Sequence, residues 1–306
     1  MEALGIDLGG TRIKLGSVAH GAVVDDLVVE STAASRGVEE ILDQVVALAE
    51  VRLEARPASR VGLAIPGLVD VESGRLLTSP NFPQWKDVHV AALLSERLGI
   101  PVHIINDASA ATLGEARSGA AAGIDNVAGF TLGTGVGGGL ILHGDLHLGS
   151  SGMAAEFGHL VVNPGGRPCG CGGRGCLEQS LGVDAIRSVL RESETGWSSR
   201  ADERDIVRDL CASARAGDPW TRDLIERVGR DLGYAIASVA LVVDIERVVL
   251  MGGVARAHDL LIPTAINGLR ERIYDEIAER ISIVAGTLGD SAGVIGAAWW
   301  AHEAGS

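Results

Sequence analysis

Apolar positions along the chain follow two different periods, which alternate. Helical spacing of apolar residues runs through 38–56, 87–98, 108–117, 181–190, 206–216, 220–243, 260–278 and 292–301, with Asp87 expected to cap the second of these helices. Short apolar runs bounded by glycine, proline or charge predict strands at 3–6, 13–18, 60–65, 101–105, 140–144, 247–251 and 281–285, and a hairpin at 70–77. This order predicts an α/β protein.

Two glycine-rich turns follow apolar strands and share one design. The first is Asp7-Leu8-Gly9-Gly10-Thr11, and the second is Thr131-Leu132-Gly133-Thr134-Gly135. Each is followed by another apolar strand and a His-Gly pair, at 20–21 and 143–144, which indicates a domain-scale duplication. Such turns present backbone N–H groups to an anion, and Asp7 at a strand end can reach a hydrated magnesium ion. An ordinary hairpin turn would use similar residues.

The second turn also contains a G-x-G-x-x-G pattern at Gly133, Gly135 and Gly138. A Rossmann turn must open a helix, whereas the residues that follow are predicted to form a strand, so we exclude the dinucleotide interpretation. The chain also lacks the G-x-x-x-x-G-K-[ST] motif of Walker-type P-loops. Gly252-Gly253, after a predicted strand, offers a backbone-only surface for a base or ribose, or simply a tight strand-to-helix turn.

Three cysteines in C-x-C-x4-C spacing, Cys169, Cys171 and Cys176, follow His159. Three thiols and an imidazole are the ligands of a tetrahedral zinc site, and four protein ligands leave no open position, so the metal is expected to be structural. A disulfide would leave one of the three thiols unpaired. Cys211 stands alone in a helical pattern and is expected to be a buried small apolar residue.

Two glutamates, Glu156 and Glu178, flank the cysteine segment. Zinc would bind one nitrogen of His159 and leave the other as an N–H donor of fixed direction. Two carboxylates and this donor would form a clamp for the hydroxyls of a polyol or sugar. The alternative is a structural zinc knuckle with two surface glutamates beside it.

Asn106 and Asp107 follow the strand predicted at 101–105 and precede a predicted helix. An aspartate at this place is suited to chemistry, although capping the helix is its commoner use. The loop 79–85 is rich in residues that break regular structure, and either lines a ligand or covers the core.

The overall composition narrows the possible partners. A chain of 306 residues predicts two domains, and a net charge of −14 argues against nucleic acid or an anionic membrane as a partner. Apolar runs are broken before they reach membrane-spanning length and no signal peptide is evident, so we expect a cytoplasmic protein.

The motifs together resemble those of the ROK family of sugar kinases, most of all its bacterial ATP-dependent glucokinases. The resemblance covers the whole chain and rests on Asp7-x-Gly9-Gly10-Thr11, Asn106-Asp107-Ala108, Leu132-Gly133-Thr134-Gly135-x-Gly137-Gly138-Gly139, Glu156-x-Gly158-His159 and Cys169-x-Cys171-Gly172-x-x-Gly175-Cys176-x-Glu178. It implies an actin-like, hexokinase-like fold in which two ribonuclease-H-like domains close on ATP and sugar. The expected domains are 1–113, with the last helix, 291–306, packing back on it, and 114–290, which contains the zinc-binding insertion.

The resemblance also implies roles for individual residues. It makes Asp107 the general base that accepts the proton of the 6-hydroxyl of a hexose. Sugar contacts are implied for Gly67, Asn81, Asn106, Asp107, Glu156, His159 and Glu178. ATP contacts, with Mg²⁺ near Asp7, are implied for Asp7, Gly9, Gly10, Thr11, Lys14, Gly133, Thr134, Gly135, Gly137, Gly138, Gly252 and Gly253. Structural Zn²⁺ is assigned to His159, Cys169, Cys171 and Cys176, and a homodimer or homotetramer is expected.

Glucose is the expected hexose, and several alternatives stay open. Kinases for N-acetylmannosamine or N-acetylglucosamine share every one of these motifs, and a fructokinase is a further possibility. A non-catalytic ROK sugar sensor would keep the fold and the zinc. The family's repressors carry an N-terminal helix-turn-helix, and here the first phosphate turn begins at Asp7, without room for one.

Overall fold

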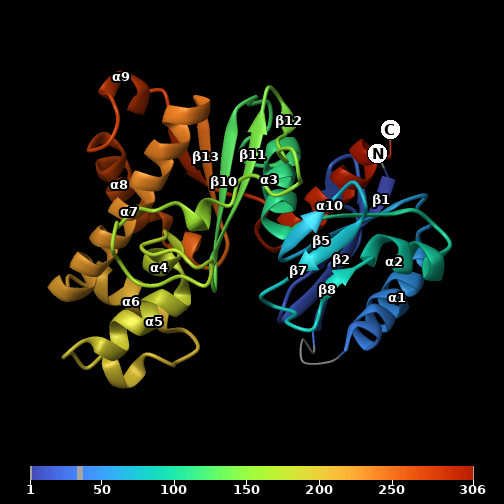
Figure 1. Cartoon of the computed structure of the whole chain (residues 1–306), viewed down its shortest axis with the longest axis horizontal. Helices are drawn as coiled ribbons and strands as arrows, with labels where there is room; N and C mark the ends of the chain where they lie inside the picture. Colours follow the sequence, from blue (N-terminus) through green and yellow to red (C-terminus); the bar gives the residue numbers. More distant parts are fainter. Residues whose placement is uncertain (1, 33–36, 306) are drawn as a thin grey trace. The chain divides into compact units, whose positions relative to one another are not determined.

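The computed structural model describes residues 2–32 and 37–305, which form two compact units (Figure 1). The first unit contains residues up to 124 together with 139–155 and those from 287 onward, and the second contains 125–138 and 156–286. Residues 114–124, 139–155 and 287–290, which were predicted to belong to the second domain, therefore lie with the first unit. The reason is that helix α3 (Asp107–Ser118) packs along the C-terminal helix α10 (Ala292–Ala304).

A six-stranded sheet forms the centre of the first unit. Its order is β3 (Ala22–Val23), β2 (Arg12–Ala19), β1 (Glu2–Leu8), β5 (Val61–Ile65) and β9 (Val102–Asn106), and β4 (Val28–Ser31) also pairs with β2. β1 is antiparallel to β2 and parallel to β5, which is parallel to β9. Because parallel strands end at the same edge, the carboxyl ends of β1, β5 and β9 deliver their following loops to one edge of the sheet.

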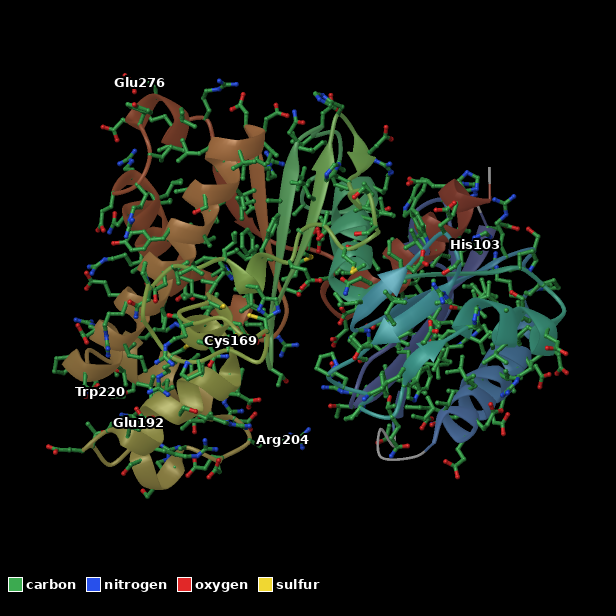
Figure 2. The ribbon with its side chains drawn as sticks, viewed as in Figure 1. His103, Cys169, Glu192, Arg204, Trp220 and Glu276 are labelled. Carbon is green, nitrogen blue, oxygen red and sulfur yellow. The ribbon has the colours of Figure 1, made fainter. Side chains whose placement is uncertain are left out.

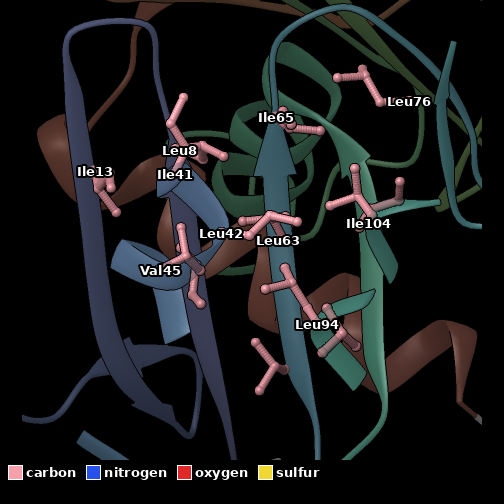
Figure 3. Close-up of a cluster of buried hydrophobic side chains, with 14 of the residues drawn as sticks. Leu8, Ile13, Ile41, Leu42, Val45, Leu63, Ile65, Leu76, Leu94 and Ile104 are labelled. Atoms are coloured by element: carbon pink, nitrogen blue, oxygen red, sulfur yellow. The ribbon is translucent and has the colours of Figure 1, made fainter. Parts of the chain in front are cut away.

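Successive side chains of β1 point to opposite faces of this sheet, and different helices pack on the two faces. Leu4, Ile6 and Leu8 point into a buried cluster with helix α1 (Val38–Ala55) and helix α2 (Val90–Leu98), part of which Figure 3 shows. Ala3, on the opposite face, packs with Val294 and Ile295 of α10. The strand period of two therefore separates a large aliphatic face from a face of small residues against α10.

A three-stranded sheet, β6 (Leu68–Asp70), β7 (Arg75–Thr78) and β8 (Lys86–Val88), confirms the predicted hairpin. The expectation that Asp87 caps a helix is wrong. Asp87 lies in β8, where its carboxylate is 2.9 Å from an Arg75 guanidinium nitrogen, and α2 begins only at Val90. Residues 86–88 pair with β7 as a strand, and this pairing with a neighbouring strand cannot be predicted from a local capping pattern.

The second unit contains three parallel strands in the order β10 (Val127–Leu132), β13 (Arg247–Met251) and β14 (Ser282–Ala285). Its helices are α4 (Glu178–Leu181), α5 (Val183–Glu192), α6 (Ile206–Arg215), α7 (Pro219–Val243), α8 (His258–Arg270) and α9 (Asp275–Ala278). Short 3-10 helices lie at Phe157–His159, Ser198–Arg200 and Val254–Ala257, and another, in the first unit, at Gly289–Ser291.

Two predicted helices are interrupted. The segment 181–190 is split at Gly182, whose extended backbone separates α4 from α5. The segment 260–278 is divided into α8, which ends at Arg270, and α9, because the backbone of Tyr274 is extended. Apolar spacing alone continued through both breaks.

Strand β11 (Val136–Leu142) starts in the second unit and continues in the first, where it pairs with β12 (Asp145–Leu146). The intervening His143-Gly144 turn has φ values of 53° and 83°, and the His20-Gly21 turn after β2 has 51° and 80°. Both pairs thus form the same left-handed two-residue turn. The glycine pattern of the second turn leads into a strand, as predicted, and not into a Rossmann helix. None of the helices formed by residues 2–32 and 37–305 has the length and apolar character that crossing a membrane would require.

Gly62 of β5 lies against the backbone of α10. A Cβ added to Gly62 would lie 1.8 Å from the carbonyl oxygen of Ala297, so Gly62→Ala must push the helix off the sheet. Overpacking of this kind costs about 1–3 kcal/mol, so we expect the melting temperature, followed by circular dichroism, to fall by roughly 2–5 °C. Gly196→Ala is the control, because nothing lies within 4 Å of its Cβ position. Equal melting temperatures for the two variants would contradict this packing.

Candidate active site and metal centre

One His and three Cys side chains of the second unit converge. The ligand atoms of His159, Cys169, Cys171 and Cys176 all lie within 4.8 Å of one another. The Cys169 sulfur is 3.6 Å from Nδ1 of His159, and the sulfurs of Cys171 and Cys176 are 3.7 Å apart without a disulfide. Ligands about 2.0–2.3 Å from a tetrahedral zinc ion have separations of this size, so the four residues fit zinc. Cys169 is labelled in Figure 2.

The loop that carries the thiols is held by short backbone contacts instead of regular structure. Pro168 and Arg174 form an isolated bridge, and the N–H of Cys169 donates to the carbonyl of Gly173 over 2.9 Å. Gly175 has φ +73°, and a Cβ there would lie 1.7 Å from the carbonyl oxygen of Asn163. A side chain at this position would therefore open the loop.

The pKa values of two of the thiols are shifted in opposite directions. Burial raises the pKa of Cys176 to about 12, whereas the backbone N–H of Gly173 lowers the pKa of Cys171. Zinc binds thiolates, so metal binding would release these protons and contribute to the stability of the folded loop.

The two ring nitrogens of His159 face different groups. Nδ1 faces the sulfur of Cys169, and Nε2 lies 3.9 Å from a carboxylate oxygen of Glu156. Burial raises the pKa of Glu156, and His159 opposes the shift. An imidazole N–H and a carboxylate that face the same space are suited to a hydroxyl group, which both donates and accepts hydrogen bonds.

Glu178 connects the metal loop to the second glycine turn. It begins α4 two residues after Cys176, and its Oε2 accepts a hydrogen bond from the N–H of Val136 over 3.2 Å. The same oxygen lies 2.3 Å from the position of a Cβ on Gly135, so a side chain there would displace the Glu178 carboxylate. The turn is further fixed by Val183, whose N–H donates to the carbonyl of Gly133 over 3.0 Å. The thiol loop, Glu178 and the turn thus support one another within the second unit.

The predicted ATP residues of the second unit have different surroundings. Gly133 has open space where a side chain would be, Thr134 accepts from Asp184 through its carbonyl, and Gly137 and Gly138 lie in β11. After β13, Gly252 has φ +89° and packs on the end of β10, while Gly253 again has open space around its Cβ position.

Asp7 is the second-last residue of β1, which leads into the first glycine turn. Burial raises the pKa of Asp7, and the Lys14 ammonium, 3.5 Å from its Oδ2, lowers it. Lys14 also lies 3.2 Å from Asp290, a partner that the sequence analysis missed because it is separated by most of the chain. A carboxylate at a strand end fits magnesium, which takes one or two protein carboxylates and fills its other positions with water and phosphate.

Asn81 lies against the first glycine turn. Its amide nitrogen is 2.6 Å from where a Cβ of Gly10 would be, and Gly9 closes the turn through an N–H bond of 2.9 Å to the carbonyl of Arg12. Phe82 and Trp85, from the same loop, are buried with ring centroids 5.1 Å apart. The aromatics thus complete the core, whereas Asn81 contacts the turn that carries Gly9, Gly10 and Thr11.

Asn106, and not Asp107, caps α3. The Asn106 side-chain oxygen accepts from the N–H groups of Ala108 and Ser109 over 2.9 and 3.1 Å. Its amide donates to the carbonyl of Gly67 over 3.0 Å, and Gly67 has φ +123°. Asp107 is the first helical residue, and its Oδ1 also accepts from the Ala108 N–H, over 2.9 Å. The helix therefore has its cap without Asp107.

The predicted site residues fall into two groups. The first unit holds Asp7, Gly9, Gly10, Thr11, Lys14, Gly67, Asn81, Asn106 and Asp107. The second holds Gly133, Thr134, Gly135, Gly137, Gly138, Glu156, His159, Glu178, Gly252, Gly253 and the three clustered cysteines. Each unit therefore carries one glycine turn and part of the polar set predicted to bind sugar.

Comparison with known proteins identifies the class. The ROK family model matches residues 3–304, and the chain belongs to the ROK family. Its fold is the actin-like ATPase fold of ROK hexokinases.

Individual relatives differ in activity. A glucokinase of Thermotoga maritima is 35% identical over 97% of this chain and 96% of its own. A ROK glucokinase structure from Streptomyces griseus, in complex with glucose and AMPPNP, has a TM-score of 0.82 and 31% identity, covering 99% of this chain and 100% of that one. The DNA-binding transcriptional repressor Mlc of Escherichia coli is 30% identical over 78% of this chain and 59% of its own.

The thiol cluster generates a direct test. We expect purified protein to contain about one zinc ion per chain and Cys171→Ser to lose it, because three ligands hold the metal less well than four. Cys211→Ala is the matched control, since Cys211 is buried in α6 and lies outside the cluster. The zinc content of each purified protein is measured by inductively coupled plasma mass spectrometry. Retention of a full zinc ion by Cys171→Ser would show that the four residues are not its site.

Proposed function

We propose that this protein is an ATP-dependent hexokinase that transfers the γ-phosphoryl group of ATP to the 6-hydroxyl of a hexose, with glucose as the preferred substrate. The observation that supports it most directly is the place of Asp107 at the carboxyl end of β9, on a helix whose cap is supplied by Asn106. Its carboxylate is thus positioned at a sheet edge without being required for the helix. Full-length similarity to glucokinases supports the choice of reaction.

Each group of residues has a role in this reaction. Asp107 accepts the proton of the attacking hydroxyl, and Asn106 fixes the start of α3 on which Asp107 lies. Glu156, His159 and Glu178 bind sugar hydroxyls, and the zinc ion holds the loop that positions them.

The phosphate groups of ATP are bound by backbone donors. The turns at Gly9-Gly10-Thr11 and Gly133-Thr134-Gly135 supply N–H groups, which explains how a chain with a net charge of −14 binds a polyanion. Gly252-Gly253 forms part of the adenosine site. Magnesium, held near Asp7, supplies charge neutralisation at the phosphates when it is bound with ATP. Zinc, magnesium, a cytoplasmic location and a homodimer or homotetramer belong to the same proposal.

Kinases for acetamido sugars and a sugar sensor without activity are the competing functions. We expect glucose to give the highest kcat/KM in a coupled assay with ATP and glucose, mannose, fructose, N-acetylglucosamine or N-acetylmannosamine. An acetamido group needs both space and a partner for its amide, which separates these substrates by several kcal/mol at most. A preference for an N-acetylhexosamine would replace glucose as the substrate, and the absence of turnover with any of the sugars would favour the sensor.

The role of Asp107 is tested by Asp107→Asn. An amide keeps the shape but not the basicity, so kcat should fall by roughly 10²- to 10⁴-fold while the calorimetric affinity for glucose stays close to that of the wild type. If the transition state is loose and the hydroxyl loses its proton late, the decrease in kcat would lie at the lower end of this range.

Asp218→Asn is the control for a pure capping change, because Asp218 caps α7 through the N–H of Thr221 over 2.8 Å. Asparagine caps as well as aspartate, so this variant should keep its kcat. If Asp107→Asn retained more than about a third of the wild-type kcat, Asp107 would not be the base.

A further inference from the structure

An open cavity of about 280 Å³ lies within the second unit. It is lined by the segment 162–176, which carries the three clustered cysteines, and by α4, α5 and α7, which are labelled in Figure 1. The volume is several times the roughly 30 Å³ that a water molecule occupies in the liquid, so a small metabolite fits. The residues predicted to bind sugar or ATP, all of them in the described part of the chain, lie outside this lining.

The lining combines apolar and polar side chains. Val162, Leu224 and Val228 are buried, and Val189 is half-buried. The polar groups are three arginines, one aspartate, two amides and a hydroxyl, namely Arg167, Arg227, Arg230, Asp231, Asn163, Gln179 and Ser180. Ligand sites have this composition, in which apolar side chains supply contact area and a few polar groups fix the orientation of the ligand.

Three cations face this cavity against one carboxylate, although the chain as a whole has 40 acidic and only 26 basic residues. The side chains of Arg167, Arg227 and Arg230 are 34%, 54% and 39% exposed, so a dissolved ligand can reach them. Each guanidinium also pairs with acids outside the lining, which are Glu192 for Arg167, Asp223 for Arg227, and Glu226 and Glu271 for Arg230. A guanidinium has five N–H donors, so these pairs hold the arginines in place and leave donors for a ligand.

Groups that bind hydroxyls lie in the same lining. The Ser180 hydroxyl donates to Oδ2 of Asp231, which directly follows Arg230 on α7. Asn163 and Gln179 add two side-chain amides. Carboxylate and amide oxygens accept hydrogen bonds from hydroxyls, and an amide NH2 also donates. The lining therefore suits a ligand that carries hydroxyl groups as well as negative charge.

We propose that this cavity is a binding site for a small phosphorylated polyol, such as a sugar phosphate. The three guanidiniums hold the phosphate, because the planar fork of arginine donates two parallel hydrogen bonds to one phosphate. Asp231, Asn163 and Gln179 bind the hydroxyls. The acidic chain would otherwise repel such a ligand, so the local excess of arginine supplies the attraction. This site is separate from the proposed kinase site. Its ligand could be the product of that reaction, glucose 6-phosphate, or a smaller ester of the same chemistry.

Isothermal titration calorimetry tests the cavity while the proposed catalytic site is filled with glucose, AMPPNP and magnesium. Glucose 6-phosphate and glycerol 3-phosphate are titrated separately, and inorganic phosphate is the probe without a polyol. We expect an ester to bind at a single saturable site per chain, at least about tenfold more tightly than inorganic phosphate, because only an ester makes the hydroxyl contacts. The tighter of the two esters identifies the source of the ligand.

Arg227→Gln removes one cation from the lining. We expect it to weaken ester binding at least about tenfold, because charge-assisted hydrogen bonds to the phosphate are lost. Arg167→Gln removes a cation from the cysteine segment and should have the same effect, which keeps the test decisive if Arg227→Gln does not fold.

Arg208→Gln, on α6, is the matched control. It removes the same charge and also breaks ion pairs with neighbouring acids, Asp205 and Asp209, but it lies outside the lining. It should change ester affinity by less than about twofold, since salt screens a distant surface charge. The melting temperature of each variant is measured alongside.

The absence of saturable ester binding to the wild-type protein would overturn the proposal. So would equal weakening in Arg227→Gln and Arg208→Gln, because the attraction would then be one of net charge. Equal affinities for the esters and for inorganic phosphate would overturn it as well, since the cavity would then hold an adventitious ion only. The kinase proposal fails separately, if the wild-type protein has no hexose-dependent turnover. Ester binding by the same variants is then measured without glucose and AMPPNP.

Discussion

Direct contact between the backbone of α10 and its neighbours is the constraint on which the first unit depends. Cβ atoms added to Gly5, Gly62, Gly114 and Gly296 would lie 2.0, 1.8, 2.5 and 1.6 Å from the carbonyl oxygens of Val294, Ala297, Ala292 and Ala110. Glycine at these places lets one helix touch β1, β5 and α3 together. Since Asp7 lies on β1 and Asp107 begins α3, the proposed magnesium ligand and the proposed general base belong to elements that pack against one common helix.

The second unit has much less regular secondary structure around its candidate site than the first unit has around its own. Between β12 and α4 the chain has only a 3-10 helix and isolated bridges, so the regular backbone hydrogen bonds of a helix or sheet do not hold this loop. We propose that zinc bound to the His and Cys cluster fixes one side of the loop, and the contact of Glu178 with Val136 and Gly135 fixes the other. The proposed sugar contacts and a phosphate turn therefore depend on the same supports, so disturbance of either should affect both ligands.

The sequence predicted what is encoded by short, local patterns. Glycine turns, the thiol spacing, the hairpin near Ser73 and most helices needed only neighbouring residues. Contacts between distant segments were missed, among them Lys14 with Asp290 and the packing of Asn81 on Gly10, because nothing in a local pattern specifies which loops meet. Glu115 was missed for a related reason. In a helical pattern a glutamate suggests an exposed face, and only the fold shows that Glu115 is buried and accepts hydrogen bonds from the N–H groups of Ala120 and Leu288.

The central proposal is that this protein transfers a phosphoryl group from ATP to the 6-hydroxyl of glucose. Phosphorus-31 NMR of a reaction with ATP, magnesium and glucose tests it most directly, because it identifies the atom that receives the phosphoryl group. The account predicts equal amounts of ADP and glucose 6-phosphate, formed only when sugar is present. Unchanged ATP, or ADP accompanied by inorganic phosphate instead of a sugar phosphate, would contradict it.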